Sequence, residues 1–94
     1  YRLIGAYAAA KAGVVSLARS IALQHAVDGV QANVVSPGFV ATEYLDETEI
    51  ERGRRTSPTR RLIEPEQVAH VVAYLVCEAG DAVNGTVTSV GDGL

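Results

Sequence analysis

A tyrosine and a lysine stand four residues apart near the start of the chain, in the run Tyr-Ala-Ala-Ala-Lys from Tyr7 to Lys11. On a helix, side chains at this spacing share one face, with Cβ atoms about 5–6 Å apart. A phenol held beside an ammonium can give and take a proton near neutral pH, because the positive charge favours the phenolate. The pair therefore indicates acid–base chemistry, although the same spacing also arises by chance in many helices.

Small residues surround this pair and keep the helix surface flat and close to the backbone. They are Ala8, Ala9, Ala10, Ala12 and Gly13. Such a surface suits a large flat ligand, and it equally suits a second helix lying against the same face. The residues alone leave both alternatives open.

The composition restricts the class of protein. The chain has 94 residues, is 48% hydrophobic and carries a formal net charge of −3, which is typical of one small globular domain. No charge excess indicates a nucleic acid or an anionic membrane as a partner, and no apolar run is long enough to span a bilayer. A single cysteine excludes an internal disulfide and favours a reducing, cytoplasmic location. Because the chain starts at Tyr1, we interpret it as a piece of a longer protein.

Apolar residues at helical spacing predict a first helix over residues 6–27. Asp28-Gly29 ends it, because glycine readily takes the left-handed conformation of a helix cap. Residues 30–36 are almost continuously apolar, as in a strand buried on both faces of a parallel sheet, and Pro37-Gly38 stops them. The first half of the chain therefore predicts a helix followed by a strand.

The second half repeats this order after the polar, irregular residues 39–62, which include a candidate short helix near 46–54. Glu64-Pro65-Glu66 opens a second helix, because proline is tolerated in a first helical turn. Residues 86–90 form the last strand. The order helix, strand, helix, strand predicts an α/β fold with a parallel sheet. Two strands are too few to cover both helices, so we expect further strands from missing sequence or from a partner.

Three motifs now occur in order: Tyr7-x-x-x-Lys11, Asn33-Val34-Val35-Ser36-Pro37-Gly38, and Thr42. Together they resemble the C-terminal half of a short-chain dehydrogenase/reductase, and they are most similar to the branch of the 3-oxoacyl-carrier-protein reductases. The resemblance continues through residues 58–69 and Asn84-Gly85. It implies that residues 1–94 are the C-terminal fragment of a single Rossmann-type domain, the last part of a doubly wound parallel sheet.

The resemblance also implies a role for each matching residue. Tyr7 would be the general acid/base at the substrate oxygen, and Lys11 would favour its ionised form and bind the ribose of NAD or NADP. Both would line the cofactor site with Pro37-Gly38, which would turn the chain at the carboxyl edge of the sheet. The backbone of Val40 and the hydroxyl of Thr42 would hold the nicotinamide carboxamide. The implied reaction is hydride transfer between nicotinamide and a small-molecule carbonyl or secondary alcohol.

Departures from the family pattern matter as well. The family's glycine-rich phosphate loop, catalytic serine and active-site asparagine precede the tyrosine, so none is expected here. Gly91-Asp92-Gly93 replaces the usual Asp-Gly-Gly, and Thr59, Arg60 and Ile63 stand where small or apolar residues, often glycine, are common. We expect the fragment alone to be inactive. The alternative is a non-catalytic truncated fragment or a dimerisation scaffold.

Other residues capable of chemistry favour structural roles. His25 and His70 are far apart in sequence, which is typical of helix-surface residues rather than metal ligands. Cys77 is predicted on the inner face of the second helix as a small core residue. Ser36 and Ser89 lack the leading glycine of a nucleophile elbow. We therefore predict no metal site and no serine nucleophile.

Two further surfaces have more than one interpretation. Five arginines form either a solvated loop, partly paired with Glu47, Glu49 and Glu51, or a contact for an anionic group on the substrate, cofactor or carrier: Arg52, Arg54, Arg55, Arg60 and Arg61. The first helix is predicted to be the interface of a homodimer or homotetramer, as in the family members that this chain resembles. Its stripe of small residues would allow close approach: Ala8, Ala12, Val15, Ala18, Arg19 and Ala22.

Overall fold

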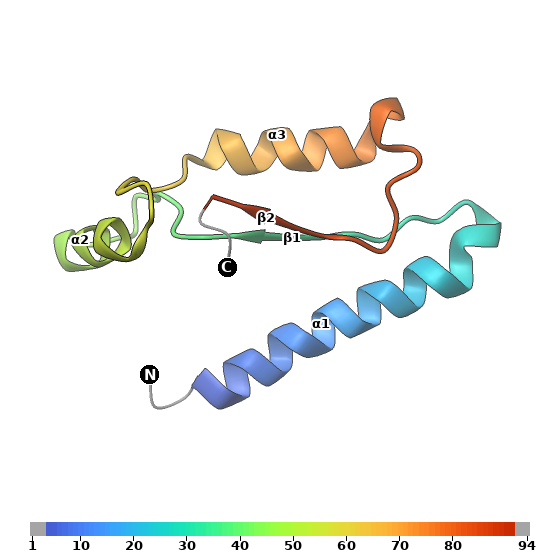
Figure 1. The fold of residues 1–94 in the computed structure, drawn as a ribbon, viewed down its shortest axis with the longest axis horizontal. Coiled ribbons are helices and arrows are strands. Elements are labelled where there is room, and N and C mark those ends of the chain that lie inside the picture. Colours follow the sequence, from blue (N-terminus) through green and yellow to red (C-terminus); the bar gives the residue numbers. More distant parts are fainter. Residues whose placement is uncertain (1–3, 92–94) are drawn as a thin grey trace. The chain divides into compact units, whose positions relative to one another are not determined.

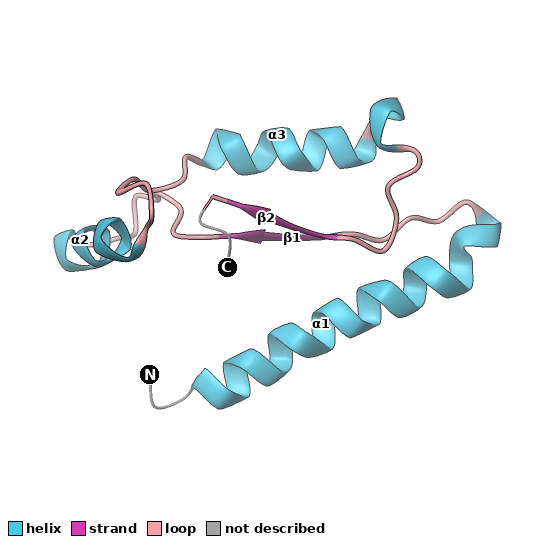
Figure 2. Cartoon of the chain, viewed as in Figure 1, coloured by secondary structure: helices cyan, strands magenta, loops and turns pink. Residues whose placement is uncertain are grey.

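The computed structural model describes residues 4–91 of the chain. Figure 1 shows the elements in order, and Figure 2 marks them by type. They are α1 (Ile4–His25), the 3-10 turn η1 (Ala26–Asp28), β1 (Val34–Pro37), α2 (Glu47–Thr56), α3 (Pro65–Val76), the 3-10 turn η2 (Glu78–Gly80) and β2 (Val87–Val90). The predicted order is confirmed, and the candidate short helix in the polar segment is α2.

The two strands form a parallel sheet. Val34 N–H donates to the Thr86 carbonyl at 2.9 Å, and Gly38 N–H donates to the Val90 carbonyl at 3.1 Å, so both strands run in the same direction. Parallel neighbours need a crossover connection, and here it contains α2 and α3. The predicted α/β class with a parallel sheet is confirmed.

Contacts divide the chain into two compact units, and each is described by itself. The first holds α1, η1 and the segment up to Val34, together with Ala82–Val87. The second holds Val35–Asp81 and the chain from Thr88 onward, and so includes α2 and α3.

The first helix ends slightly earlier than the predicted residue 27. α1 stops at His25, and the chain tightens into η1. Gly29 then takes φ 78°, and its N–H donates to the Ala26 carbonyl at 3.0 Å. The left-handed cap predicted at Gly29 is confirmed, because glycine has no Cβ to oppose that conformation.

The first strand begins later than the predicted residue 30, and side-chain amides explain why. Asn33 Nδ2 donates to the Val83 carbonyl at 2.9 Å, and Ala32 N–H donates to Asn84 Oδ1 at 3.0 Å. The two segments therefore lie side by side, but asparagine side chains replace the backbone ladder there. Regular strand pairing starts only after them.

Caps define the two later helices. Asp46 Oδ1 accepts from Glu49 N–H at 2.8 Å at the start of α2. Glu64 and Gln67 form a reciprocal capping box at the start of α3, with Glu64 N–H donating to Gln67 Oε1 at 2.8 Å. Pro65 occupies the first turn, as the sequence predicted.

The structure corrects the prediction for Cys77, which does not lie in a core. This cysteine is exposed, because α3 ends at Val76 and Cys77 serves as its C-cap residue. Its thiol donates to the Tyr74 carbonyl at 3.3 Å.

Apolar burial is sparse. Within residues 4–91, the buried apolar residues are Ala22 and Ile63. Leu17 is 61% exposed and Leu23 is 84% exposed, both on α1. β1 is half-buried along most of its length rather than buried on both faces as predicted. Two strands leave helix faces uncovered, as the sequence indicated.

Candidate functional site

The tyrosine and the lysine of the first motif meet on α1. The Lys11 Nζ lies 5.3 Å from the centroid of the Tyr7 ring, which is within the range of a cation–π contact. Tyr7 is 64% exposed. Within the described residues, Lys11 takes part in no ion pair. The ammonium therefore faces the phenol and is accessible to a ligand.

The second group of predicted residues follows the end of β1. Gly38 N–H donates a hydrogen bond to the Val90 carbonyl, and this bond joins the turn after Pro37 to β2. Ile63 N–H donates to the Phe39 carbonyl at 2.8 Å, and Ala41 N–H donates to the Ile63 carbonyl at 2.8 Å. These two bonds are the pattern of a parallel bridge.

This bridge determines where the backbone of Val40 points. In a parallel pair, the residue between the two bonded neighbours directs its own N–H and C=O to the opposite side of the strand. No hydrogen bond joins either group of Val40 to another residue in the range 4–91. Val40 therefore offers one donor and one acceptor on the side away from Ile63.

Thr42 adds a hydroxyl to the same segment. Thr42 is exposed, and its carbonyl accepts from Leu45 N–H at 3.3 Å in a turn. Its side chain has no hydrogen-bond partner within the described part of the chain. The segment from Val40 to Thr42 thus presents an amide N–H, a carbonyl and a hydroxyl, which are the complements of a primary carboxamide.

The structure brings Tyr7 to Lys11, and it brings Val40 to Ile63. The first pair belongs to one unit and the second to the other. Pro37, Gly38, Val40 and Thr42 are neighbours along the chain, so their common location follows from the sequence. The contact between Ile63 and the Val40 segment does not follow from the sequence, because Ile63 lies more than twenty positions from Val40.

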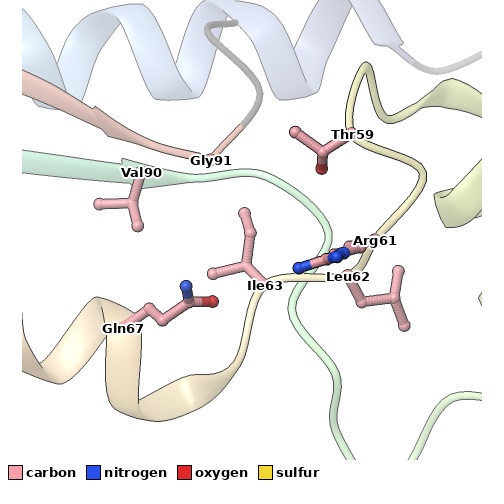
Figure 3. Close-up of a pocket in the computed structure, with 7 residues that line it drawn as sticks. All are labelled: Thr59, Arg61, Leu62, Ile63, Gln67, Val90 and Gly91. Carbon is pink, nitrogen blue, oxygen red and sulfur yellow. The ribbon is translucent and has the colours of Figure 1, made fainter.

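A hollow of about 470 Å³ lies beside this bridge (Figure 3). Its lining residues are Thr59, Arg61, Leu62, Ile63, Gln67, Val90 and Gly91. Two of them, Ile63 and Gly91, are positions where the sequence departs from the family pattern. That departure was the only sequence signal for their importance, and their contact was not predictable from it.

All five arginines of the arginine-rich segment are exposed, and Arg52, Arg54 and Arg55 lie on α2 rather than in a loop. Arg60 has φ 61°, a left-handed conformation that is unusual for a residue with a side chain. Its Nη1 donates to the Arg55 carbonyl at 3.4 Å. Arg60 therefore has a backbone conformation that glycine adopts more readily than a residue with a side chain.

The described residues contain neither a cluster of metal ligands nor a helix fit to span a membrane. No group of three or more His, Cys, Asp or Glu side chains in the range 4–91 is placed to hold a metal ion. Over the same range, no helix combines the length and the apolar character needed to cross a membrane.

Comparison with known proteins gives a consistent result. A family model described as enoyl-(acyl carrier protein) reductase matches residues 2–94. The 3-oxoacyl-[acyl-carrier-protein] reductase MabA of Mycobacterium tuberculosis is 40% identical over 91 residues. The cyclohexanol dehydrogenase of an Acinetobacter species is 39% identical over 83 residues. A crystal structure of a short chain dehydrogenase from Bacillus anthracis aligns with a TM-score of 0.79 at 32% identity.

These matches cover most of this chain but only part of each relative. The alignment with MabA spans 94% of this chain and 37% of the relative, and that with cyclohexanol dehydrogenase spans 88% and 33%. The alignment with the Bacillus anthracis structure spans 92% of this chain and 35% of that one. The chain therefore spans about a third of the length of the proteins that it matches.

Proposed function

Because this chain belongs to the short-chain dehydrogenase/reductase family, we propose that it is the C-terminal fragment of an NAD(P)-dependent oxidoreductase. The substrate class is a carbonyl or a secondary alcohol. Relatives named for a 3-oxoacyl group and for cyclohexanol support this class, since the first name describes a ketone and the second a secondary alcohol. On this proposal residues 1–94 are one part of a single Rossmann-type domain, and they are inactive by themselves.

The observation that carries the proposal is the contact between Tyr7 and Lys11. The phenol donates its proton to the substrate oxygen during reduction and takes it back during oxidation. The ammonium lies 5.3 Å from the ring centroid and so keeps a positive charge beside the phenol. Because Tyr7 is well exposed, its hydroxyl is accessible to a substrate.

The residues after β1 fit the nicotinamide end of a cofactor. Val40 N–H and C=O and the Thr42 hydroxyl have no partner within residues 4–91, and a carboxamide supplies matching groups. Pro37 and Gly38 turn the chain at the carboxyl edge of the sheet, where ligands bind in open α/β folds. Lys11 binds the ribose. When bound, the nicotinamide supplies or accepts the hydride.

The direct test is Tyr7→Phe in the complete protein. Removing the phenolic proton is expected to lower kcat by about 10²–10⁴-fold, the usual contribution of general acid–base catalysis. The dissociation constant for NADH or NADPH should stay nearly the same, because the ring remains. Tyr44→Phe is the matched control, since Tyr44 is 87% exposed and lies outside the proposed site. A Tyr7→Phe protein with normal kcat would contradict the assignment and favour the non-catalytic scaffold.

The exposed surface of α1 supports assembly of the complete protein as a homodimer or homotetramer. Ala12, Val15 and Arg19 line a shallow hollow on this helix, and small side chains allow close approach of a second helix. Ala18→Glu should shift the sedimentation of the complete protein toward smaller species. If the unchanged protein is a monomer at micromolar concentration, α1 is not a subunit interface.

A cytoplasmic location stays a prediction from the lone Cys77.

A further inference from the structure

Ile63 and Gly91 fit together in a way that leaves no room for a larger residue at position 91. Ile63 is 5% exposed, and its side chain points toward the end of β2 (Figure 3). A Cβ placed on Gly91 would lie 2.6 Å from Ile63 Cγ1 and closer still to Ile63 Cδ1. Non-bonded carbon atoms prefer about 3.5–4.0 Å. The isoleucine side chain therefore occupies the space that a side chain at position 91 would need.

The backbone of the same isoleucine holds the segment after β1. The Ile63 carbonyl accepts a hydrogen bond from Ala41 N–H, and Ile63 N–H donates one to the Phe39 carbonyl; both donor–acceptor distances are 2.8 Å. These two bonds determine the direction of the Val40 N–H and C=O. The Ile63 side chain therefore packs beside Gly91, while the Ile63 backbone is hydrogen-bonded to the segment that contains Val40.

We propose that Ile63 is a positioning residue for the nicotinamide end of the cofactor, and that its contact with Gly91 sets the position of Val40. This inference rests on the proposed function, in which Val40 and Thr42 hold the carboxamide. A β-branched side chain has little freedom to rotate about its Cα–Cβ bond. A Cβ added at position 91 therefore displaces Ile63, and the two backbone bonds pass that displacement to Val40.

The main experiment uses Gly91→Ala in the complete protein, with two ligands. NADH or NADPH, whichever the protein uses, reports the nicotinamide end. ADP-ribose or its 2′-phosphate lacks the nicotinamide and reports the rest of the cofactor site. Gly91→Ala should weaken dinucleotide binding by about tenfold, because small misplacements of positioning groups have effects of this size or larger. Binding of the ligand without nicotinamide should change less than twofold.

A double variant tests whether the effect passes through Ile63. Ile63→Ala removes the two atoms that collide with the new Cβ. Ile63→Ala/Gly91→Ala should therefore recover most of the affinity that Gly91→Ala loses. Ile63→Ala alone should weaken dinucleotide binding a few-fold through the cavity it leaves. If Gly91→Ala does not fold, the Ile63→Ala variant provides the test. The inference is overturned if Ile63→Ala weakens the binding of both ligands equally, or the binding of neither.

Gly85→Ala separates steric displacement from backbone strain. Gly85 has φ 73° and Gly91 has φ 101°, so alanine is strained at both positions. Within residues 4–91, a Cβ on Gly85 meets only Ala22 Cβ, at an ordinary 3.5 Å. Gly85→Ala should leave the ratio of the two dissociation constants unchanged. If it changes that ratio as much as Gly91→Ala does, strain alone explains the result and the inference is wrong.

Thr42→Ala distinguishes failure of this inference from failure of the proposed function. Loss of one neutral hydrogen bond should weaken dinucleotide binding by roughly fivefold and leave the ligand without nicotinamide unaffected. If Thr42→Ala has this effect and Gly91→Ala does not, the cofactor contact stands and the positioning role falls. If neither variant discriminates between the ligands, the segment does not hold the nicotinamide, and both proposals fall.

Discussion

The two regions proposed for chemistry are built in different ways. On α1, Tyr7 and Lys11 meet because a helix places residues four apart on one face. After β1, the direction of the Val40 backbone depends on Ile63, and the placement of Ile63 depends on Gly91. The first region needs one turn of helix, whereas the second needs three segments that are distant in sequence.

This difference determines how each region responds to substitution. On α1, a change should act through the altered side chain itself, because the neighbouring small residues make few contacts there. After β1, a substitution at Gly91, which has no side chain to bind a ligand, can displace the Val40 N–H and C=O that are proposed to bind the cofactor. The exposure of Tyr7 and the burial of Ile63 are consistent with this division.

Lys11→Ala should give the largest effect among the variants that sharpen this comparison. Lysine is expected to bind the ribose, so its loss should weaken dinucleotide binding by roughly 10–100-fold, the range for a hydrogen bond to a charged group. Titration of Lys11→Ala and Tyr7→Phe with the cofactor provides the measurement. Arg19→Ala is the control, an exposed cation farther along α1. Equal affinity in Lys11→Ala and Tyr7→Phe would remove lysine from the ribose site.

Asn33→Ala should destabilise the complete protein by about 2 kcal/mol. Asn33 accepts from Thr86 N–H at 3.0 Å, and its removal takes this partner from a part-buried backbone group, whereas the Val83 carbonyl keeps its bond from Gln31. The free energy of unfolding in denaturant is the measurement. Gln31→Ala should cost less, because Gln31 is exposed where it donates to Val83. Equal losses would show that the asparagine does not join these segments in the way we describe.

Glycine-to-alanine substitutions in α1 and α2 compare an open helix surface with one that packs against the segments around Phe39 and Leu62. A Cβ on Gly13 in α1 meets nothing within 4 Å in the described chain, whereas one on Gly53 in α2 would lie 2.6 Å from Leu62 Cδ2. Gly13→Ala should stabilise by up to about 1 kcal/mol through helix propensity. Gly53→Ala should destabilise by about 1 kcal/mol, because overpacking exceeds that gain. Thermal unfolding of both variants is the measurement. Destabilisation by Gly13→Ala would mean that the complete protein packs against this face.

Arg60→Gly should give the smallest effect, a stabilisation of about 0.5 kcal/mol. Glycine adopts the left-handed φ of 61° without steric cost, although it also gains entropy in the unfolded chain. Arg61→Gly removes the same charge at the next position, where φ is not positive, and should destabilise slightly. The denaturation midpoints of the two variants should therefore move in opposite directions. Movement in the same direction would assign the effect to charge rather than to backbone conformation.

Several features were predictable because they depend on local geometry. The cap at Gly29 and the helix start at Pro65 follow from the conformations that glycine and proline favour. The late start of β1 was not predictable, since it depends on asparagines that are neighbours only after the chain returns. Cys77 was placed wrongly in a core, because helical periodicity does not show where a helix ends.

The shared face of Tyr7 and Lys11 follows from the sequence alone, because 3.6 residues per turn bring side chains four apart together wherever a helix forms. The order of the elements follows as well, from apolar periodicity and turn residues. The bridge from Ile63 to the Val40 segment, and the filling of the space beside Gly91 by Ile63, are instead properties of the folded chain. The physical reason is distance along the chain: such contacts exist only when separate segments return to one place, and no local rule encodes which atoms then meet.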